Sequence, residues 1–255
     1  DLISGLMKAL GSGGLLLDPA ERLGYSYDNS RRQSLPDAVA LPTTREQVLA
    51  IVRLCREHKT PITARGRGTN TTGASVPVEG GLVLSFERMN RILEIRPGDR
   101  VAIVEPGLLN GELQQALRTH GLFWPPDPTS APYCTIGGNL ACNAGGPRAV
   151  KYGATRDNVL ALTAVTGTGE LVAFGTRTNK NSSGFDLSRL LIGSEGGLAL
   201  VVEATLKLSP KPAATRMLRA LYQVLRAAQG LNLANVIAAS AEGYPFPTNL
   251  DSNPP

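Results

Sequence analysis

The sequence predicts an α+β protein with two small lobes. Hydrophobic residues make up 42% of the 255 positions, which is enough to fill a core. Helical and β-type patterns follow one another in two mixed groups, without the regular βαβ alternation of a doubly wound sheet. The 28 Gly and 18 Pro residues predict many tight turns and close backbone approaches.

Two helices are expected in the first sixty residues. Apolar residues at helical spacing predict a short helix over residues 1–10. The polar, turn-rich stretch 18–39 is predicted to be a loop. A second helix is predicted over residues 44–58, because Gln47 stands three positions after Thr44, as in a capping box, and apolar residues follow at helical spacing.

The elements expected beyond residue 60 are shorter and are separated by Gly, Pro and Asn. The predicted strands are Ile62–Ala64, Leu82–Ser85, Ile92–Ile95, Val101–Val104, Ala161–Thr166, Leu171–Phe174 and Leu198–Leu208. The predicted helices are Leu109–Thr119 and Phe185–Ile192. The sequence TGTGE at 166–170 is predicted to be a hairpin turn.

Composition excludes several classes of function. The 26 basic and 21 acidic residues are dispersed and aromatic residues make up only 5%, which argues against nucleic-acid binding. No apolar run approaches the ~18 residues needed to span a bilayer, and the first residues do not resemble a signal peptide. The cysteines form no CxxC pair and the two histidines lie in unrelated segments, so we expect reduced thiols and no metal site.

Common nucleotide-binding and nucleophile motifs are absent. Gly66, Arg67 and Gly68 begin like a dinucleotide fingerprint, but Thr71 stands where the third glycine belongs. The sequence has no Walker A loop, no G-x-S-x-G elbow and no H-E-x-x-H.

Three segments rich in Gly and other small or polar residues remain as candidate binding loops. Residues 65–73 suit a nest of backbone N–H groups that binds phosphate, and an ordinary loop with exposed arginines is the alternative. Residues 135–146 suit a backbone laid flat against a planar ligand, and a surface loop is the alternative. Residues 193–197 either present backbone amides to a ring or form an ordinary tight turn.

Six motifs occur along the chain in a fixed order, and they include the three candidate loops. They are RGRGTNTTG (65–73), PDPTS (126–130), TIGGNLACNAGG (135–146), KYG (151–153), GFDLSRLLIGSEGGL (184–198) and VEATLKLSPKP (202–212). Together they resemble the FAD-binding domain of the vanillyl-alcohol oxidase/p-cresol methylhydroxylase superfamily, and are most like the glycolate oxidase flavin subunit and bacterial D-lactate dehydrogenases. The resemblance covers roughly residues 36–215.

The resemblance implies two α+β lobes, with a boundary near residue 105, that clasp an FAD between them. Residues 1–35 would form an N-terminal helix and loop, and residues 216–255 the start of a substrate-binding cap domain or an unrelated tail. Such a cap would follow a segment like Met217–Tyr222. The 33 residues after Tyr222 show no likeness to it, so we expect the cap to be missing and this chain alone to turn over substrate poorly.

The resemblance also implies which residues contact FAD. Those that would cradle the pyrophosphate are Gly66, Arg67, Gly68, Thr69, Asn70 and Gly73. Those that would line the ribityl chain and the isoalloxazine are Pro126, Asp127, Ser130, Thr135, Gly137, Gly138, Asn143, Gly145 and Gly146. Those that would close over the adenosine half or the lobe interface are Gly153, Glu195, Gly196 and Val202.

The chain departs from the superfamily pattern at a few positions. Asn70 stands where covalent relatives carry a histidine, which implies a non-covalent FAD. Arg67 replaces a usual Gly or Ala, so its side chain must point away from the flavin or contact a phosphate. Gly197 and Ala199 change the usual GSEGTLG to GSEGGLA.

The function that the resemblance implies is an FAD-dependent dehydrogenase of a small 2-hydroxy acid such as glycolate or D-lactate. Hydride would pass from the substrate to flavin N5, and a quinone or a partner subunit would accept the electrons. The expected location is the cytoplasm, either free or peripheral to the inner membrane. An FAD-binding subunit without autonomous catalysis and a remnant that binds no flavin are the alternatives. No catalytic residue is assigned, because His58 and His120 end predicted helices and suit solvated positions.

Overall fold

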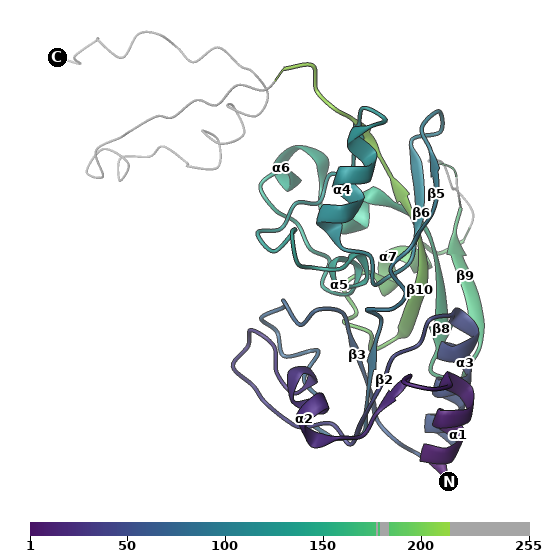
Figure 1. Ribbon diagram of the computed structural model, residues 1–255. Coiled ribbons are helices and arrows are strands. Elements are labelled where there is room, and N and C mark those ends of the chain that lie inside the picture. Colours follow the sequence, from purple (N-terminus) through teal and green to yellow (C-terminus); the bar gives the residue numbers. More distant parts are fainter. Residues whose placement is uncertain (177, 179–183, 215–255) are drawn as a thin grey trace, which may run out of the picture.

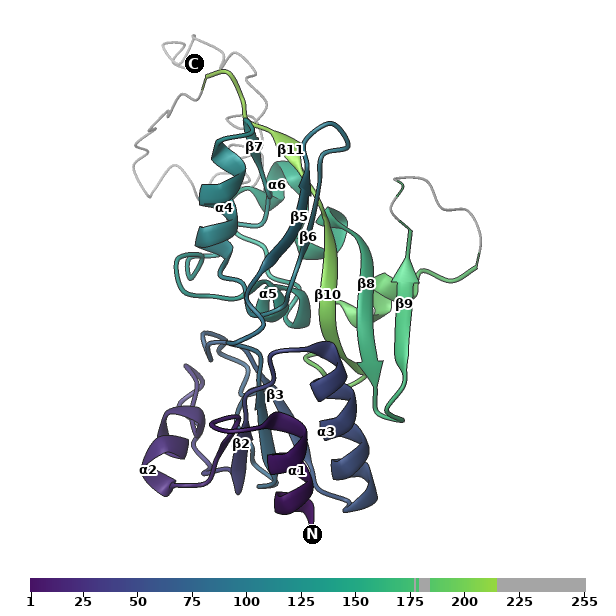
Figure 2. The ribbon, with the colours of Figure 1, turned by 45° about the vertical axis from the view of Figure 1, so that its right-hand side comes forward.

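The computed structural model describes residues 1–176, 178 and 184–214, which form two lobes stacked end to end (Figures 1 and 2). The predicted tail at residues 216–255 lies outside the described residues. Within the described part, no helix combines the length and the apolarity that crossing a membrane requires. The same residues contain no group of three or more His, Cys, Asp or Glu side chains that could hold a metal ion.

The first lobe is built on a four-stranded sheet with the strand order β1-β2-β4-β3. Its strands are β1 (Leu15–Leu16), β2 (Ala38–Ala40), β3 (Ile62–Arg65) and β4 (Leu82–Ser85). Strands β2 and β3 both pair with β4 in parallel, and β1 pairs with β2 in antiparallel orientation. Because side chains alternate along a strand, Ala38 and Ala40 face helices on one side while Val39 packs on the other.

The second lobe is built on a five-stranded antiparallel sheet with the order β5-β6-β10-β8-β9. Its strands are β5 (Ile92–Arg96), β6 (Val101–Val104), β8 (Val159–Thr166), β9 (Leu171–Gly175) and β10 (Ala199–Lys207). The long strand β10 is central, since two hairpins, β5–β6 and β8–β9, pair with its two edges. A two-stranded ribbon of β7 (Leu122–Phe123) and β11 (Ser209–Pro210) completes the lobe.

Seven α-helices and two short 3₁₀ helices occur among the described residues. Those of the first lobe are α1 (Leu2–Leu10), α2 (Pro19–Arg22), η1 (Leu23–Tyr25) and α3 (Arg45–Glu57). Those of the second lobe are α4 (Asn110–Arg118), α5 (Ile136–Ala141), α6 (Ala149–Tyr152), η2 (Thr155–Asn158) and α7 (Leu187–Leu191). Figure 1 shows α1 and α3 side by side along the first lobe and α4, α5 and α6 on one side of the second sheet.

Helix α3 illustrates how local sequence specifies an element. The Thr44 side chain accepts a hydrogen bond from the Gln47 amide at 3.2 Å, and the Gln47 side chain accepts one from the Thr43 amide at 2.7 Å. These bonds satisfy backbone donors that a helix start leaves unpaired. Val48 and Ile51 then lie on the buried face of the helix, against the first sheet.

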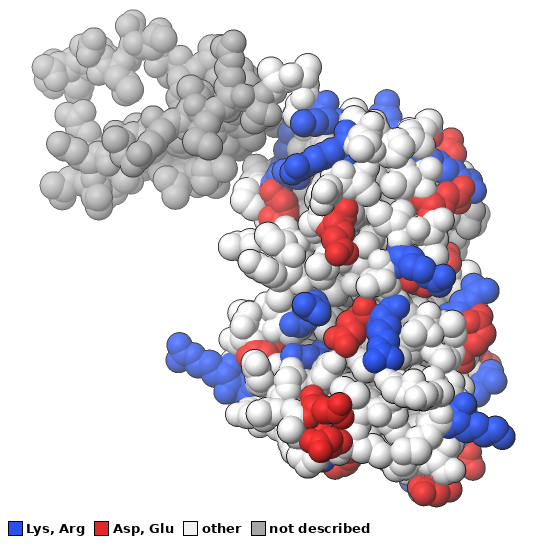
Figure 3. Space-filling model, in the orientation of Figure 1, with Lys and Arg blue, Asp and Glu red and all other residues white. Residues whose placement is uncertain are grey.

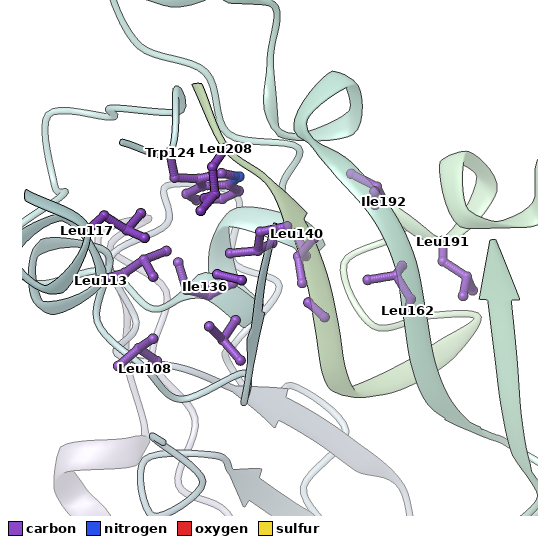
Figure 4. Packing of buried hydrophobic residues seen from close by; sticks show 14 of the residues in the cluster. Leu108, Leu113, Leu117, Trp124, Ile136, Leu140, Leu162, Leu191, Ile192 and Leu208 are labelled. Atoms are coloured by element: carbon purple, nitrogen blue, oxygen red, sulfur yellow. The ribbon is translucent and has the colours of Figure 1, made fainter. Parts of the chain in front are cut away.

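The core of the second lobe surrounds one fully buried tryptophan (Figure 4). Trp124 lies close to Leu208, and its indole Nε1 donates a hydrogen bond to the Asn158 carbonyl oxygen at 3.0 Å. Ile136 and Leu140 of α5 belong to the same cluster and lie beside Leu113 and Leu117 of α4. A helix as short as α5 is therefore stabilised by packing as well as by its cap.

The two lobes share part of a core and so form one body. Val165 of β8 and Val202 of β10 are buried among first-lobe residues such as Ile51. From α3, Arg53 donates a hydrogen bond to the Gly169 carbonyl at 2.9 Å and Arg56 donates one to Thr168 at 3.0 Å. The hairpin of the second sheet is thereby fastened to a helix of the first lobe.

The sequence predicted most of these elements. The helices expected over 1–10, 44–58 and 109–119 are confirmed to within one residue at each end, and all seven expected strands are confirmed to within two. The hairpin turn at 166–170 is also confirmed, with the Gly169 amide bonded to the Thr166 carbonyl at 2.9 Å. The helix expected over 185–192 begins two residues later, because Asp186 caps it.

Three expectations need correction. Residues 18–39 are not a plain loop: Asp18 caps the short helix α2 through the Ala20 amide, and β2 begins at Ala38. Residues 136–141 of the second glycine-rich segment form helix α5. The sheets divide the chain between β4 and β5, ahead of residue 105, because β5 and β6 pair with the strands of the second lobe.

Gly107 packs against the segment between β4 and β5, where the chain passes between the lobes, and leaves no room for a side chain. A Cβ there would overlap the Phe86 carbonyl oxygen and lie 2.8 Å from that of Met89. We expect Gly107→Ala to lower the free energy of unfolding by roughly 1–3 kcal/mol, the usual cost of overpacking, as measured by thermal and urea unfolding. Gly98→Ala is the matched control, since no heavy atom lies within 4 Å of its Cβ, and equal stability of the two variants would contradict the expectation.

Candidate functional site

A pocket between the lobes brings the three glycine-rich segments together. Its lining comes from residues 64–70 at the end of β3, residues 134–144 around α5, and residues 194–201 at the start of β10, joined by Pro106, Pro128 and Ser130. Segments separated by fifty or more positions along the chain thus share one cavity. The pocket lies where the first sheet, α5 and β10 meet (Figure 1).

The pocket gathers eleven of the residues that the sequence proposed for cofactor contacts. They are Gly66, Arg67, Gly68, Thr69, Asn70, Ser130, Thr135, Gly137, Gly138, Glu195 and Gly196. The other eight do not line it: they are Gly73, Pro126, Asp127, Asn143, Gly145, Gly146, Gly153 and Val202. Among these eight, the Gly73 amide donates to Asn70 Oδ1 in the lining at 3.3 Å, and Val202 is buried in the core that the lobes share.

The first loop (residues 66–73) presents a row of unpaired backbone donors. Among the described residues, none of the N–H groups of residues 66–71 has a hydrogen-bond acceptor. Consecutive free amides along a turn are a typical anion cradle, and Gly68, at φ +64°, supplies the left-handed step that such a turn needs. This loop fits a phosphate.

A buried cluster beneath the loop holds it in shape. The Arg65 guanidinium donates to the Ser75 carbonyl at 3.3 Å and to the Gly24 carbonyl at 3.1 Å, and lies over the Tyr25 ring. Burial lowers the pKa of Arg65, and the nearby Asp28 carboxylate partly offsets this. Arg65 therefore supports the fold of the loop, whereas Arg67 is exposed and lines the pocket.

The first and second loops meet at one tight contact. A Cβ on Gly66 would overlap the hydroxyl oxygen of Thr135. That same oxygen accepts a hydrogen bond from the Gly138 amide at 3.1 Å and caps α5. Thr135 thus sets both the start of α5 and the closest approach of the two loops.

Buried amide side chains fix the second loop (residues 135–146) from behind. Asn110 Nδ2 donates to Asn139 Oδ1 at 2.9 Å and to the Pro126 carbonyl at 3.1 Å. Asn139 in turn donates to the Cys134 thiol at 3.2 Å, and Gln114 donates to the Trp124 carbonyl at 2.6 Å. Sequence reasoning did not single out Asn110 or Asn139, although an Asn on the apolar face of a predicted helix was a usable signal.

The pocket is mostly uncharged, and its lining includes apolar side chains such as Phe86, Leu191 and Leu200 beside its glycines and polar residues. Of its described lining residues, Arg65, Arg67 and Glu195 carry charge, and neither His58 nor His120 is among them. Both histidines are exposed, as expected from their positions at helix ends. Over the face of the molecule in Figure 3, basic and acidic side chains are intermixed and not separated by sign.

A glycine-lined cavity with a phosphate cradle on one side defines a nucleotide-binding α+β protein. A family model described as an FAD binding domain matches residues 36–175, which is more than half of the chain. The chain therefore belongs to this family of FAD-binding domains, and FAD is its cofactor. The free amides of residues 66–71 fit the pyrophosphate of that cofactor.

Curated relatives extend the match beyond the family model. The chain is 44% identical over 236 residues to the glycolate oxidase subunit GlcD of Bacillus subtilis, covering 91% of this chain and 50% of that protein. It is 45% identical over 177 residues to a D-lactate dehydrogenase of Anaerostipes hadrus, covering 69% of this chain and 37% of that protein. The chain thus spans about half the length, or less, of the curated relatives it matches.

Solved structures confirm the two-lobed fold. An alkyldihydroxyacetonephosphate synthase matches with a TM-score of 0.74 at 27% identity, covering 84% of this chain and 44% of that one. A p-cresol methylhydroxylase matches with a TM-score of 0.74 at 22% identity and the same coverage, which shows the fold alone. The α+β fold of the p-cresol methylhydroxylase type, expected from the six motifs, is confirmed.

The contact between Gly66 and Thr135 can be tested by a double-mutant cycle. We expect Gly66→Ala to lower the free energy of unfolding by roughly 1–3 kcal/mol and to abolish FAD retention on gel filtration, because the new methyl overlaps the threonine hydroxyl. In a Thr135→Ala background the nearest remaining atom, the Cβ at position 135, is 3.5 Å away. There Gly66→Ala should cost almost nothing, and an undiminished cost would show that the two residues are not coupled.

One of the two cysteines that line the pocket, Cys142, gives a pH-dependent test. Burial, followed by the charges of Glu195 and Asp28, raises the pKa of Cys142, so less of the reactive thiolate is present at neutral pH than for a free cysteine. We expect iodoacetamide to label Cys142 slowly at neutral pH, faster as the pH rises, and more slowly when FAD is added, as followed by mass spectrometry. Cys55, with a pKa raised by burial to about 11, is the internal control that stays unlabelled. Labelling of Cys142 at the rate of a free thiol, regardless of FAD, would contradict this.

Proposed function

We propose that this chain is the FAD-binding part of an oxidoreductase that dehydrogenates a small 2-hydroxy acid, with the FAD held non-covalently. The observation that carries the proposal is the convergence of three glycine-rich segments on one inter-lobe pocket. The names of the curated relatives support the substrate class: glycolate oxidase subunit, D-lactate dehydrogenase and D-2-hydroxyglutarate dehydrogenase. When bound, FAD supplies the hydride acceptor.

The chain's own residues bind and orient the cofactor in this proposal. The amides of residues 66–70 take the pyrophosphate oxygens, because these residues line the pocket and their N–H groups have no acceptor among the described residues. Gly137 and Gly138 of α5 both line the pocket: a Cβ on Gly138 would meet only the Thr135 hydroxyl, so a flat ring can approach the backbone there, whereas Gly137 lets α5 pack closely against Pro106. Thr135 fixes the spacing of the two surfaces.

Asn70 supports non-covalent binding. Its side chain is used within the first loop, where Nδ2 donates to the Ser75 hydroxyl at 2.8 Å and Oδ1 accepts from the Thr72 and Gly73 amides, each at 3.3 Å. An amide also lacks the nucleophilic ring nitrogen that a histidine would offer. Asn70 therefore shapes the loop and does not attach the flavin.

An FAD-binding subunit that acts only with a partner chain is the second candidate. The word "subunit" in the names of the glycolate oxidase relatives favours it. In either case a quinone or a partner subunit would reoxidise the flavin, and the general base and the carboxylate clamp remain to be assigned, since no described residue lining the pocket is a histidine. The two candidates differ in whether the chain alone oxidises substrate.

The proposal is tested by flavin content and substrate bleaching. We expect the purified chain to retain FAD that acid precipitation releases into the supernatant. In the anaerobic protein, a 2-hydroxy acid from the series glycolate, D-lactate and D-2-hydroxyglutarate should abolish the absorbance of oxidised flavin, whereas L-lactate should not. Repeating the measurement with a candidate partner subunit distinguishes an autonomous dehydrogenase from a subunit that needs its partner.

Each outcome has a defined meaning. Bleaching without any other chain supports autonomous dehydrogenation, and bleaching only with a partner supports the subunit. Flavin that stays on the precipitated polypeptide contradicts non-covalent binding. Flavin that is bound but unaffected by every 2-hydroxy acid, with or without a partner, contradicts the substrate class.

A further inference from the structure

One wall of the pocket consists of two loops that are joined by backbone hydrogen bonds. In the third loop (residues 193–197), the Gly193 amide donates to the Leu140 carbonyl and the Glu195 amide donates to the Ala141 carbonyl, each at 2.9 Å. Glu195 adopts a left-handed φ of +54°, which costs free energy for a residue with a side chain. The third loop therefore needs support to keep its place against the second.

Arg156 of η2 contacts both of these loops. Its guanidinium Nη2 donates to the Ile192 carbonyl at 2.8 Å, directly before the third loop. Its backbone amide donates to Asn143 Oδ1 at 3.0 Å, in the second loop, where Asn143 also has a left-handed φ of +47°. One residue thus bridges the two segments, and it lies behind the wall, outside the pocket lining.

The geometry around Gly193 shows how closely the guanidinium fits. A Cβ on Gly193 would lie 3.2 Å from Arg156 Nη2 and 3.3 Å from the Asn143 Cβ. Arg156 Nε is buried and has no hydrogen-bond partner in the described part of the chain, an arrangement that by itself is unfavourable. The hydrogen bond from Arg156 Nη2 to the Ile192 carbonyl offsets the cost of burying this unpaired Nε.

We propose that Arg156 is a positioning residue that sets the third loop against the second and thereby keeps the cofactor pocket in its binding shape. This inference rests on the proposed function, because the pocket is taken to hold FAD. Arg156 acts through Gly193, Ser194 and Glu195 and touches no cofactor itself. Removing its side chain should loosen that wall without unfolding the lobes.

The experiment compares two arginines that make the same kind of bond. In Arg156→Met the side chain keeps its apolar length but loses the hydrogen bond to Ile192. The matched control is Arg53→Met, which loses a guanidinium bond of 2.9 Å to the Gly169 carbonyl, at the interface between α3 and the β8–β9 turn. We expect Arg156→Met to weaken FAD binding roughly tenfold to a hundredfold, as for a lost charged hydrogen bond, and Arg53→Met to leave it within about twofold.

A second readout does not depend on FAD. Hydrogen exchange of the full chain without added FAD should show faster exchange at the Gly193 and Glu195 amides in Arg156→Met, and unchanged exchange there in Arg53→Met. Urea unfolding of both variants accounts for any global loss of stability. Unchanged exchange at these two amides, or FAD binding weakened equally by both substitutions, would overturn the inference.

A conservative variant separates positioning from general destabilisation. Arg156→Lys retains a donor for the Ile192 carbonyl, so it should bind FAD more tightly than Arg156→Met and protect the Gly193 amide better. If Arg156→Met fails to fold, Arg156→Lys is used for the test. FAD affinity and amide protection equal to those of the unsubstituted chain would support a positioning role for the hydrogen bond to the Ile192 carbonyl. Loss of FAD binding together with loss of protection at the Gly193 amide would contradict that role. If the unsubstituted chain binds no FAD, the proposed function fails, and the exchange measurement still decides the role of Arg156.

Discussion

The structure depends on strand β10, which is paired along both edges. It lies between β6 and β8 and so joins the β5–β6 and β8–β9 hairpins into one sheet. Its Val202 side chain enters the core that the lobes share, and its first residues, Ala199, Leu200 and Val201, form part of the pocket. A register slip of one residue would exchange these buried and pocket-facing positions. The lobe arrangement and the cavity therefore follow from one set of strand pairings.

Much of the fold could be predicted from the sequence because its longer elements obey simple periodicities. Helix α3 carries its own cap and a continuous apolar face, and β10 is long, with Glu203, Thr205 and Lys207 alternating with apolar residues. The elements that were missed lack such signals. Strands β1 and β2 have only two and three residues, and β2 is buried on both faces, so no alternation marks it. Helix α5 has two glycines among its six residues and is formed by the Thr135 cap and by packing of Ile136 and Leu140.

The candidate site was predictable in part for a similar reason. A row of small residues such as Gly66 and Gly68 is visible in a sequence, because glycine marks places where backbone must come close to something. What it comes close to is not visible: the overlap that Gly66 avoids is with Thr135, sixty-nine positions later in the chain. Supporting residues such as Asn110 and Arg156 have ordinary neighbours in the sequence, and their roles appear only when distant loops are placed side by side.

The pairing of β6 with β10 also has a kinetic consequence. Val104 and Ala204 are direct cross-strand partners although a hundred positions separate them, and the pocket draws on chain from residue 64 to residue 201. Contacts between residues so far apart in the chain form late in folding, because closing a long loop costs conformational entropy. On the ribosome, the N-terminal segments that supply the phosphate cradle emerge long before β10 does. Cofactor capture is thus confined to the end of synthesis of this region, and until then the edges of β6 and β8 are open to pairing with other chains.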